Sequence, residues 1–565
     1  MDDVRARAEA WLAADPDPDT RAELRGLIAR GGAELRERFA TRLEFGTAGI
    51  RGPLGAGPAR MNRLVVRRVT AGLAAHLLAG SPDAAARGVV VGRDARHKSA
   101  EFAVDTADVL AEAGIRVHVF ERAVPTPLLA FAVRHLGAAA GVQITASHNP
   151  AADNGYKVFG AGGAQILPPI DAAISAAIDA AGDGAPASAG SSPLICAVDP
   201  HVYPAYARSA LALVPPGGPR ELRIVYTPLH GVALDLARGL LYGAGFRDVE
   251  AVPEQAEADP DFPTVPFPNP EEPGALDRAL ALAAAKDADL VLANDPDGDR
   301  LAVAVPDGTG WRALSGDEVG CLLAEALLSR DPGGSERVVG TTVVSSRLFA
   351  KIADAHGASY VETLTGFKWL AAAAAAAEAE GRRMVLAYEQ ALGVMVGTAV
   401  RDKDGLSAAL VVADLAARLK ADGRTLIDVL DDLARRHGLH LTGGMSVRLQ
   451  NDPSLVDRAL AGLRSAPPRR LGSATVIAVA DHLVGTRTGT DGSSDHLPTP
   501  STDMVGLALD DGSRVQVRPS GTEPLLKFYG EVIEPAGEDV SAARVRAGAR
   551  LSALLDAFTA ATRIS

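Results

Sequence analysis

Apolar and polar positions along the chain predict helices first and alternating strands and helices afterwards. Residues 1–43 carry alanine and leucine at helical spacing among charged residues, which predicts helices. From residue 44, short apolar runs such as 88–92 and 140–145 alternate with amphipathic stretches such as 126–136. This alternation is typical of a mostly parallel sheet covered by helices on both faces.

Chain length and local composition predict several domains. A chain of 565 residues is too long for one hydrophobic core. The stretch 181–194 is rich in alanine, glycine, serine and proline and indicates a connection between two units. We expect an N-terminal helical segment followed by four domains, with the boundaries 1–43, 44–200, 201–324, 325–440 and 441–565.

Composition narrows the class of protein and its partners. The chain is 47% hydrophobic and 22% charged, which is ordinary for a folded soluble protein. The net charge of −13 argues against nucleic acid or an anionic membrane as the main partner. The two cysteines, Cys196 and Cys321, do not form a disulfide framework or a metal-ligand spacing. A charged N-terminus and the lack of a long apolar run predict a cytoplasmic protein.

The loop 295–300 reads Asp-Pro-Asp-Gly-Asp-Arg and is a candidate metal site. Asp295, Asp297 and Asp299 occupy alternate positions, and alternate residues of an extended segment point the same way. Their oxygens suit a hard cation such as Mg²⁺. The alternatives are a solvated acidic turn or a Ca²⁺ loop, but the EF-hand pattern is missing. Arg300 either holds this loop or approaches a phosphoryl group.

The loop 145–150 reads Thr-Ala-Ser-His-Asn-Pro and offers a candidate nucleophile. Ser147 stands beside His148, which is either a general base or a residue that only shapes the turn. No Gly-x-Ser-x-Gly elbow surrounds Ser147, so the pair is weak evidence for a hydrolase. Lys157 lies just downstream and is expected to reach the same pocket. A serine hydroxyl together with a Mg²⁺ site points to phosphoryl transfer.

Two further loops are candidates for substrate binding. Arg518-Pro-Ser-Gly-Thr522 combines a guanidinium, two hydroxyls and a glycine that lets backbone N–H groups face an anion. Lys527 adds a positive charge nearby, and the alternative is a simple Pro-Gly turn. Glu389 follows a predicted strand, where a carboxylate either accepts hydrogen bonds from sugar hydroxyls or is an ordinary surface residue.

Lysine is scarce in this chain. Only eight of the 57 basic residues are lysines, so a lysine in a loop motif is more informative than usual, although chance placement is the simpler explanation. The lysines that lie beside loop motifs are Lys98, Lys157, Lys368, Lys403 and Lys527.

Taken together, these loops resemble those of the α-D-phosphohexomutases, the phosphoglucomutase/phosphomannomutase superfamily. The resemblance covers about residues 44–533, with the motifs in matching order. It is strongest for the branch that contains the phosphoglucomutase-2-like and phosphopentomutase enzymes. The motifs that carry it are Phe45–Gly52, Thr145–Pro150, Asp295–Arg300, Thr365–Lys368, Tyr388–Gly393 and Arg518–Thr522.

The resemblance implies an architecture and a role for each loop. It implies an α/β protein with three mixed-sheet domains and a C-terminal α+β domain around a central cleft. Ser147 would carry a phosphoryl group, and Asp295, Asp297 and Asp299 would hold Mg²⁺ together with a phosphoserine oxygen. His148, Lys157 and Arg51 would be acid/base or charge-stabilising residues. The implied substrate-binding residues are Arg300, Thr365, Gly366, Lys368, Glu389, Lys403, Arg518, Ser520, Gly521, Thr522 and Lys527.

The expected activity is a mutase that interconverts sugar 1-phosphates and 6-phosphates of glucose or mannose. A sugar 1,6-bisphosphate is the expected activator, a small sugar phosphate the expected partner, and a monomer or weak dimer the expected state. The alternatives are a phosphopentomutase, a sugar-bisphosphate synthase, a Mg²⁺-dependent phosphatase and a non-catalytic sugar-phosphate sensor. One departure from the family pattern is Gln390, where a second acid is common.

Overall fold

A computed structural model gives the fold of the chain. It describes residues 2–46, 49–180, 182, 190–448, 454–520 and 525–562. Two residues with an expected role, Gly521 and Thr522, lie outside the described residues, as does most of the predicted connection at 181–194. Within the described part of the chain, no helix combines the length and apolar character needed to cross a membrane.

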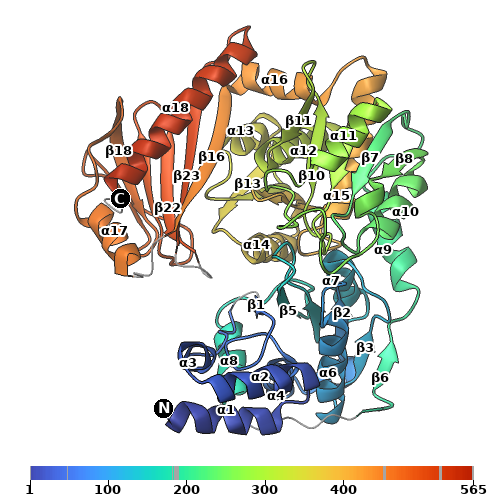
Figure 1. Ribbon diagram of the computed structural model, residues 1–565. Helices are drawn as coiled ribbons and strands as arrows, with labels where there is room; N and C mark the ends of the chain where they lie inside the picture. Colours follow the sequence, from blue (N-terminus) through green and yellow to red (C-terminus); the bar gives the residue numbers. More distant parts are fainter. Residues whose placement is uncertain are drawn as a thin grey trace. The chain divides into compact units, whose positions relative to one another are not determined.

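Four β-sheets form the framework of the described residues (Figure 1). The first has the order β1 (Ile50–Pro53), β5 (Asp153–Gly160), β4 (Ala140–Ile144), β2 (Val89–Arg93), β3 (Val117–Val119) and β6 (Ile195–Ala197). The second has the order β11 (Trp311–Leu314), β10 (Ala302–Pro306), β9 (Leu290–Ala293), β7 (Arg223–Thr227) and β8 (Asp248–Ala251). The third has the order β13 (Ser359–Thr363), β12 (Arg337–Thr342), β14 (Arg383–Glu389) and β15 (Gly393–Val396). The fourth has the order β16 (Leu439–Arg448), β23 (Leu525–Glu534), β22 (Arg514–Pro519), β21 (Val505–Leu509), β18 (Ala474–Asp481), β19 (Thr486–Gly489) and β20 (Ser494–His496), and β17 (Arg470–Leu471) pairs with β18.

Parallel and antiparallel pairs coexist in the first two sheets. Strand β2 runs parallel to β3 and β4, whereas β5 is antiparallel to both β4 and β1. Strand β7 runs parallel to β8 and β9, and β10 turns back antiparallel to β9. The expected mixed α/β sheets are therefore confirmed. The serine loop follows β4 and the acidic loop follows β9, so each lies at the carboxyl end of a strand, where ligand loops of such sheets belong.

The chain divides into two compact units. The first comprises Met1–Ser315, Phe367–Ala387 and Ala391–Gly423, and the second comprises Gly316–Gly366, Tyr388–Gln390 and Arg424–Ser565. In the first unit the helices are α1 (Asp2–Ala14), α2 (Pro18–Arg30), α3 (Ala33–Ala40), α4 (Arg63–Gly80), α5 (Ala84–Arg87), α6 (Ser99–Glu112), α7 (Thr126–His135), α8 (Ile170–Ala180), α9 (Val202–Leu211), α10 (Leu234–Ala244), α11 (Asp277–Lys286), α14 (Phe367–Ala379) and α15 (Gly405–Ala421), with a short 3-10 turn at Pro253–Gln255. In the second unit they are α12 (Gly316–Arg330), α13 (Leu348–Ala355), α16 (Leu426–His437), α17 (Ser454–Ser465) and α18 (Val540–Ala561).

The N-terminal helices belong to the core of the first unit. Helix α2 begins at Pro18, where the side chain of Asp17 accepts a hydrogen bond from the Asp19 amide and caps the helix. Trp11 and Phe39 are buried in one apolar cluster with α4, α6 and the first sheet. Helices α1, α2 and α3 occupy most of residues 2–40 and pack against the first sheet and its helices (Figure 1).

The second unit is built around the fourth sheet. Helix α18 crosses β16 and β23, as Figure 1 shows in red and orange, and Phe558 packs edge-to-face on Phe528 of β23. Strand β16 pairs antiparallel with β23 along its whole length, from Leu439 to Arg448. The Gly- and Ser-rich region 472–500 contains strands β18, β19 and β20, each of which pairs antiparallel with its neighbour.

Candidate active site

A strained turn presents Ser147 at the end of β4. Ser147 has a φ of 55°, a left-handed conformation that is uncommon for a residue other than glycine. Its amide donates to the Thr145 hydroxyl at 2.8 Å, which stabilises the turn. The side chain is buried at 3% exposure, and its Oγ donates to Asp295 Oδ2 at 2.8 Å. Strain of this kind is a marker of functional positions.

Arg96 supports the backbone of the turn that contains Ser147. Its two terminal nitrogens donate to the carbonyl oxygens of Ser147, Asn149, Pro150 and Asp153 at 2.5 to 3.2 Å. Its Nε lies 3.3 Å from Asp94 Oδ2, and both side chains are buried. The guanidinium has five N–H donors in a fixed plane, whereas a lysine has only three on a single nitrogen, so arginine suits a site with four carbonyls.

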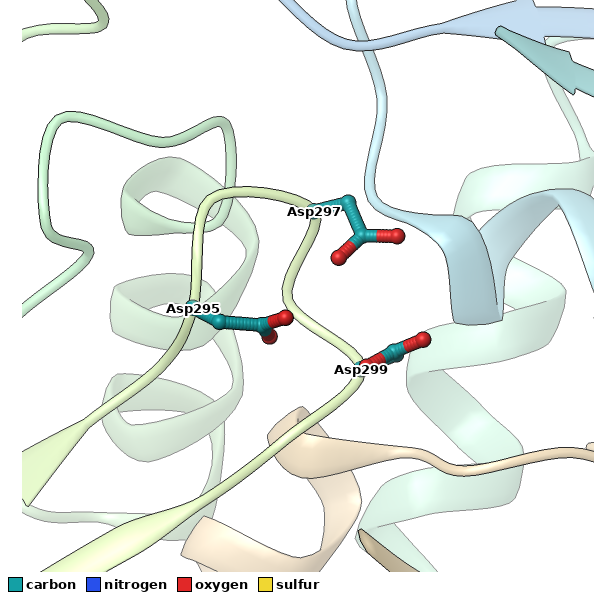
Figure 2. Close-up of side chains that lie close together, drawn as sticks. All are labelled: Asp295, Asp297 and Asp299. Carbon is teal, nitrogen blue, oxygen red and sulfur yellow. The ribbon is translucent and has the colours of Figure 1, made fainter. Parts of the chain in front are cut away.

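The three carboxylates of the acidic loop meet at one place. Figure 2 shows Asp295, Asp297 and Asp299 arising from a single loop, and each residue is fully buried. One oxygen from each lies within 4.8 Å of the others. The convergence predicted from their spacing is confirmed, but its cause differs from the prediction. The loop is a tight turn with Gly298 at a φ of 71°, not an extended segment.

Neighbouring segments fix the acidic loop in place. The Thr126 hydroxyl donates to Asp297 Oδ2 at 2.6 Å, and the Thr126 amide donates to the Asp297 carbonyl at 2.9 Å. The Arg300 amide donates to Asp295 Oδ1 at 3.0 Å. Gly231 is required beside this loop, because a Cβ there would lie 2.4 Å from Pro296. These contacts hold the carboxylates in one geometry before any ligand arrives.

Two lysines lie against the carboxylates. Lys157 Nζ donates to Asp297 Oδ2 at 2.7 Å and to Asp299 Oδ2 at 3.1 Å. Lys403 Nζ lies 3.2 Å from Asp299 Oδ2. Burial lowers the pKa of Lys157, but the charges of Asp297 and Asp299 outweigh it and raise that pKa above its usual value. Lys157 is therefore a cation at neutral pH, and two of the loop-motif lysines converge on the acidic loop.

The carboxylate set fits a divalent cation. Among the described residues, Asp297 Oδ1 and Asp299 Oδ1 are buried and have no hydrogen-bond partner. Burial and the charges of Asp299 and Asp297 raise the pKa of Asp295 well above its usual range. Buried oxygens without partners are costly unless a cation or a proton satisfies them. The buried aspartate triad is thus able to bind a metal ion, whose charge would offset the mutual repulsion of its carboxylates.

His148 lies beside the nucleophile. Its Nδ1 is 3.2 Å from Ser147 Oγ. Burial and the positive charges of Arg300 and Arg51 hold the pKa of His148 well below its usual value, so the ring is neutral at pH 7. Arg51 contacts the same turn, because its Nη1 donates to Asn149 Oδ1 at 2.9 Å. Ser147, His148, Lys157, Arg51 and the acidic loop therefore lie in one cluster within the first unit.

The remaining expected residues of the first unit are Arg300 and Lys368. Arg300 Nη1 donates to Glu271 Oε2 at 3.2 Å, so its head reaches beyond the acidic loop. Lys368 lies on helix α14 rather than in the loop that the sequence predicted, because that helix begins one residue earlier at Phe367. Its Nζ is 5.6 Å from the centre of the Trp369 ring.

Six expected residues are described in the second unit. Thr365 and Gly366 follow β13, and Gly366 has a φ of 112° that a side chain would strain. Glu389 ends β14 and is 8% exposed. Arg518 and Lys527 are opposite one another on β22 and β23, which brings both cations to one place, and the Ser520 amide donates to the Leu525 carbonyl at 2.9 Å.

Two residues of the cluster around Ser147 were missed from the sequence, Arg96 and Thr126. Arg96 lies in the loop that follows β2, and Thr126 is the first residue of α7, the helix that comes after β3. The rule that ligand loops gather at the carboxyl ends of parallel strands could have identified both. Neither residue stands in a motif with a chemical signature of its own, and so their sequence neighbourhood offered no further signal.

Comparison with known proteins agrees with this arrangement. Domain descriptions of the phosphoglucomutase/phosphomannomutase family match in order: α/β/α domain I over residues 42–184, domain II over 205–308, domain III over 315–437 and the C-terminal domain over 497–547. A probable phosphoribomutase of Schizosaccharomyces pombe is 39% identical over 92% of this chain and 92% of its own length. The phosphopentomutase of Mus musculus is 36% identical over 93% of this chain and 90% of its own length.

A solved structure supports the same fold. The crystal structure of a putative phosphomannomutase from Thermus thermophilus has a TM-score of 0.65 at 23% identity, and the match covers 91% of this chain and 99% of that one. The chain belongs to the phosphoglucomutase/phosphomannomutase family of phosphosugar mutases. Its relatives at 34% to 39% identity also include proteins named phosphomannomutase and glucose 1,6-bisphosphate synthase, so the family does not define the sugar.

Proposed function

We propose that this protein moves a phosphoryl group between the 1-hydroxyl and the terminal hydroxyl of a sugar phosphate, through a phosphorylated Ser147. One observation carries the proposal. The buried Ser147 hydroxyl donates to Asp295 at 2.8 Å, beside two aspartate oxygens that have no partner among the described residues. A nucleophile held next to a cation site is the arrangement that phosphoryl transfer requires.

The reaction has two transfers that balance. In the first, the bond from phosphorus to Ser147 Oγ breaks, a bond from phosphorus to a sugar hydroxyl oxygen forms, and the hydroxyl proton passes to a base. The product is a sugar bisphosphate. In the second, Ser147 Oγ attacks the other phosphoryl group of that bisphosphate, the bond from that phosphorus to its sugar oxygen breaks, and the base returns its proton to this oxygen, which restores the phosphoserine and releases the isomeric monophosphate. A sugar 1,6-bisphosphate supplied from solution phosphorylates Ser147 by the same second step, and this explains its expected role as activator.

The charges in the cluster assign different tasks to its residues. His148 is neutral at pH 7 because burial and nearby arginines lower its pKa, so its ring nitrogen is available to accept the hydroxyl proton. Lys157 is charged because Asp297 and Asp299 raise its pKa, so it stabilises negative charge on the transferring group. Arg51 adds a second cation beside the serine turn through its contact with Asn149.

Asp295, Asp297 and Asp299 are the proposed Mg²⁺ ligands, together with an oxygen on Ser147. Bound Mg²⁺ would supply positive charge to the phosphoryl oxygens. An all-oxygen ligand set is the one that Mg²⁺ prefers. Thr126, Lys157 and Lys403 hold the same carboxylates through their other oxygens, which leaves Oδ1 of Asp297 and Asp299 for the metal.

The remaining residues of the proposed site bind the phosphate and the sugar of the substrate. Arg518, Ser520, Gly521 and Thr522 bind a substrate phosphate, with Lys527 opposite Arg518 as a second cation. Glu389 accepts hydrogen bonds from sugar hydroxyls. The residues proposed to contact the sugar phosphate elsewhere are Arg300, Thr365, Gly366, Lys368 and Lys403. We propose that the chain consists of an N-terminal helical segment, 1–43, and four domains at 44–200, 201–324, 325–440 and 441–565.

Glucose and mannose phosphates are the first candidate substrates, and ribose or deoxyribose phosphates are the second. The pentose candidate is favoured by the names of the Schizosaccharomyces pombe and Mus musculus relatives. One feature of the sugar loop also bears on this choice. Gln390 occupies a position that is often acidic in the family, and its Oε1 accepts from the Ser345 hydroxyl at 3.1 Å, so its side chain is held against Ser345.

A ³¹P NMR time course tests the reaction and names the sugar. Glucose, mannose and ribose 1-phosphates are each incubated with the protein, Mg²⁺ and a trace of the matching bisphosphate. We expect one of them to become its terminal phosphate without release of free phosphate, and Ser147→Ala to abolish this conversion while the folded protein persists. Release of free phosphate would indicate a phosphatase instead. Normal turnover by Ser147→Ala would refute the phosphoserine mechanism.

A further inference from the structure

Residues 259–276 form a proline-rich segment of the first unit, directly before helix α11. All of these residues are described, and none of them belongs to a helix or a strand. A connection of this length without secondary structure is uncommon in a compact domain and is often functional. Proline fixes φ, so the segment is stiffened by its six prolines, which are Pro260, Pro263, Pro266, Pro268, Pro270 and Pro273.

One part of this segment packs against the support of the serine turn. The Arg96 guanidinium lies over the Phe262 ring, 4.9 Å from its centre. Phe262 is buried and has a φ of 45°, which is an outlier for a bulky side chain. Phe262, Val265 and Ala275 form a small apolar cluster. Ala151, which directly follows the serine loop, packs against this cluster, so the segment and the serine loop share one apolar contact.

Other contacts fix the segment on either side of Phe267. The Thr264 hydroxyl lies 2.8 Å from His230 Nε2 and accepts a hydrogen bond from Gln255 Nε2 at 2.9 Å. Glu271 Oε2 accepts from Arg300 Nη1 at 3.2 Å, next to the acidic loop. The backbone that carries Phe267 is therefore anchored before and after this residue.

Phe267 is exposed although its surroundings are not. Its side chain is 36% exposed, whereas Pro268 and Asn269 directly after it are buried. The centre of the Phe267 ring lies 6.3 Å from that of the His148 ring, and the two planes are tilted by 49°. This separation is within the range of aromatic pairs. A single exposed apolar side chain is ordinary on a surface, but here an anchored segment holds it against the ring beside Ser147.

We propose that Phe267 is a positioning residue, which restrains the His148 imidazole beside Ser147 and covers one side of it against bulk water. The proposal rests on the proposed function, in which His148 accepts a hydroxyl proton. His148 Nδ1 lies 3.2 Å from Ser147 Oγ, at the long end of the hydrogen-bond range, so a small rotation of the ring breaks this contact. The terminal torsion of histidine is broad, and packing around the ring therefore decides its orientation.

Carbethoxylation of His148 by diethyl pyrocarbonate tests the contact without any turnover. The reagent modifies neutral imidazoles that it can reach, and peptide mass spectrometry gives the rate at His148 alone. Phe267→Ala truncates an exposed ring and leaves no buried cavity, so the fold should persist. We expect His148 to react about two- to tenfold faster in this variant, the factor that corresponds to loss of an aromatic contact. Phe267→Tyr, which keeps the ring, should react at the wild-type rate.

Steady-state kinetics of the mutase reaction tests the positioning role. Phe267→Ala should lower kcat about two- to tenfold and change KM by less than about twofold, because the base is misplaced while the contacts to the sugar phosphate remain. Phe267→Tyr should restore kcat. This split between kcat and KM, with rescue by the conservative variant, is not expected from a side chain that only supports the fold.

Tyr242→Ala is the matched control. Tyr242 is 37% exposed and lies on helix α10, which packs against α9, α15 and β8, so neither rate should change. Equal carbethoxylation of His148 in wild type and Phe267→Ala would overturn the contact. Faster carbethoxylation with unchanged kcat would overturn the positioning role. If the wild-type protein converts no sugar phosphate, the proposed function fails, whereas carbethoxylation still decides whether Phe267 covers His148.

Discussion

Replacement of Arg96 by methionine should release the serine turn. Methionine fills part of the volume but donates no hydrogen bond, so the carbonyls of Ser147, Asn149, Pro150 and Asp153 lose their shared donor. Asp94 also loses the guanidinium that lies 3.3 Å from its Oδ2. Removal of one partner from a buried ion pair typically costs about 3–5 kcal/mol.

This cost should appear locally, as opening of the turn. A loss of about 3–5 kcal/mol corresponds to a rise of about two to four powers of ten in the population of the open turn. Hydrogen exchange measures that population at amides bonded within the turn, such as Asn149 N–H to the Ala146 carbonyl and Asp153 N–H to the Pro150 carbonyl. We expect exchange of these amides to accelerate about a hundredfold or more, and kcat to fall with it. Arg96→Lys, which keeps the charge but lacks the fork, should lie between wild type and Arg96→Met.

A matched variant separates this effect from the general loss of an arginine. Arg87 also donates to two carbonyls, those of Gly137 and Ala138. It lies nearer the surface, and neither of these bonds reaches the serine turn. Arg87→Met should leave exchange of the serine turn and kcat unchanged. If Arg96→Met leaves both quantities at wild-type values, the reasoning that Arg96 positions Ser147 is wrong.

Three further predictions concern the metal site and a buried ion network. Asp297→Asn should raise the Mg²⁺ concentration for half-maximal activity about tenfold or more. Asp307→Asn, at an exposed turn, should leave that concentration unchanged. If both variants need the same Mg²⁺ concentration, Asp297 is not a metal ligand. Thr126→Val should weaken Mg²⁺ binding while Thr126→Ser preserves it, because only the hydroxyl donates to Asp297; calorimetry with Mg²⁺ distinguishes the two. Burial raises the pKa of Glu531, but Arg514, His440 and Arg347 outweigh it and leave that pKa below its usual value. A carboxylate with a lowered pKa stabilises the fold at pH values above its unfolded pKa of 4.5, and this stabilisation is lost as the pH falls below that value. Glu531→Gln should therefore lower Tm at pH 7 by an amount equivalent to about 3 kcal/mol. The difference in Tm from wild type should narrow steadily in thermal melts below pH 4.5, and a constant difference would contradict the prediction.

Much of the fold follows from local pattern. The strand at Arg223–Thr227 and the helix from Ser99 agree closely with their apolar periodicity, because a buried strand or helix face constrains every second or every third to fourth residue. Lys368 is the exception. A Gly-Phe-Lys loop motif and a helix start look alike in sequence, and the helix begins at Phe367. Strands β19 and β20 in region 472–500 are mostly exposed, and exposed strands carry little apolar pattern.

The sequence by itself determined the chemical groups of the candidate site. Ser147 and the three aspartates are recognisable because a nucleophile and a cation site need those residue types at close spacing. Only the tertiary structure decided what surrounds them. Arg96 and Thr126 come from other strand ends, and Lys157 and Lys403 stand far apart in the chain, yet both lysines reach Asp299. Local sequence carries the identity of each group, but charge state and orientation depend on which distant groups the fold buries beside it, and those contacts exist only once the sheets have assembled.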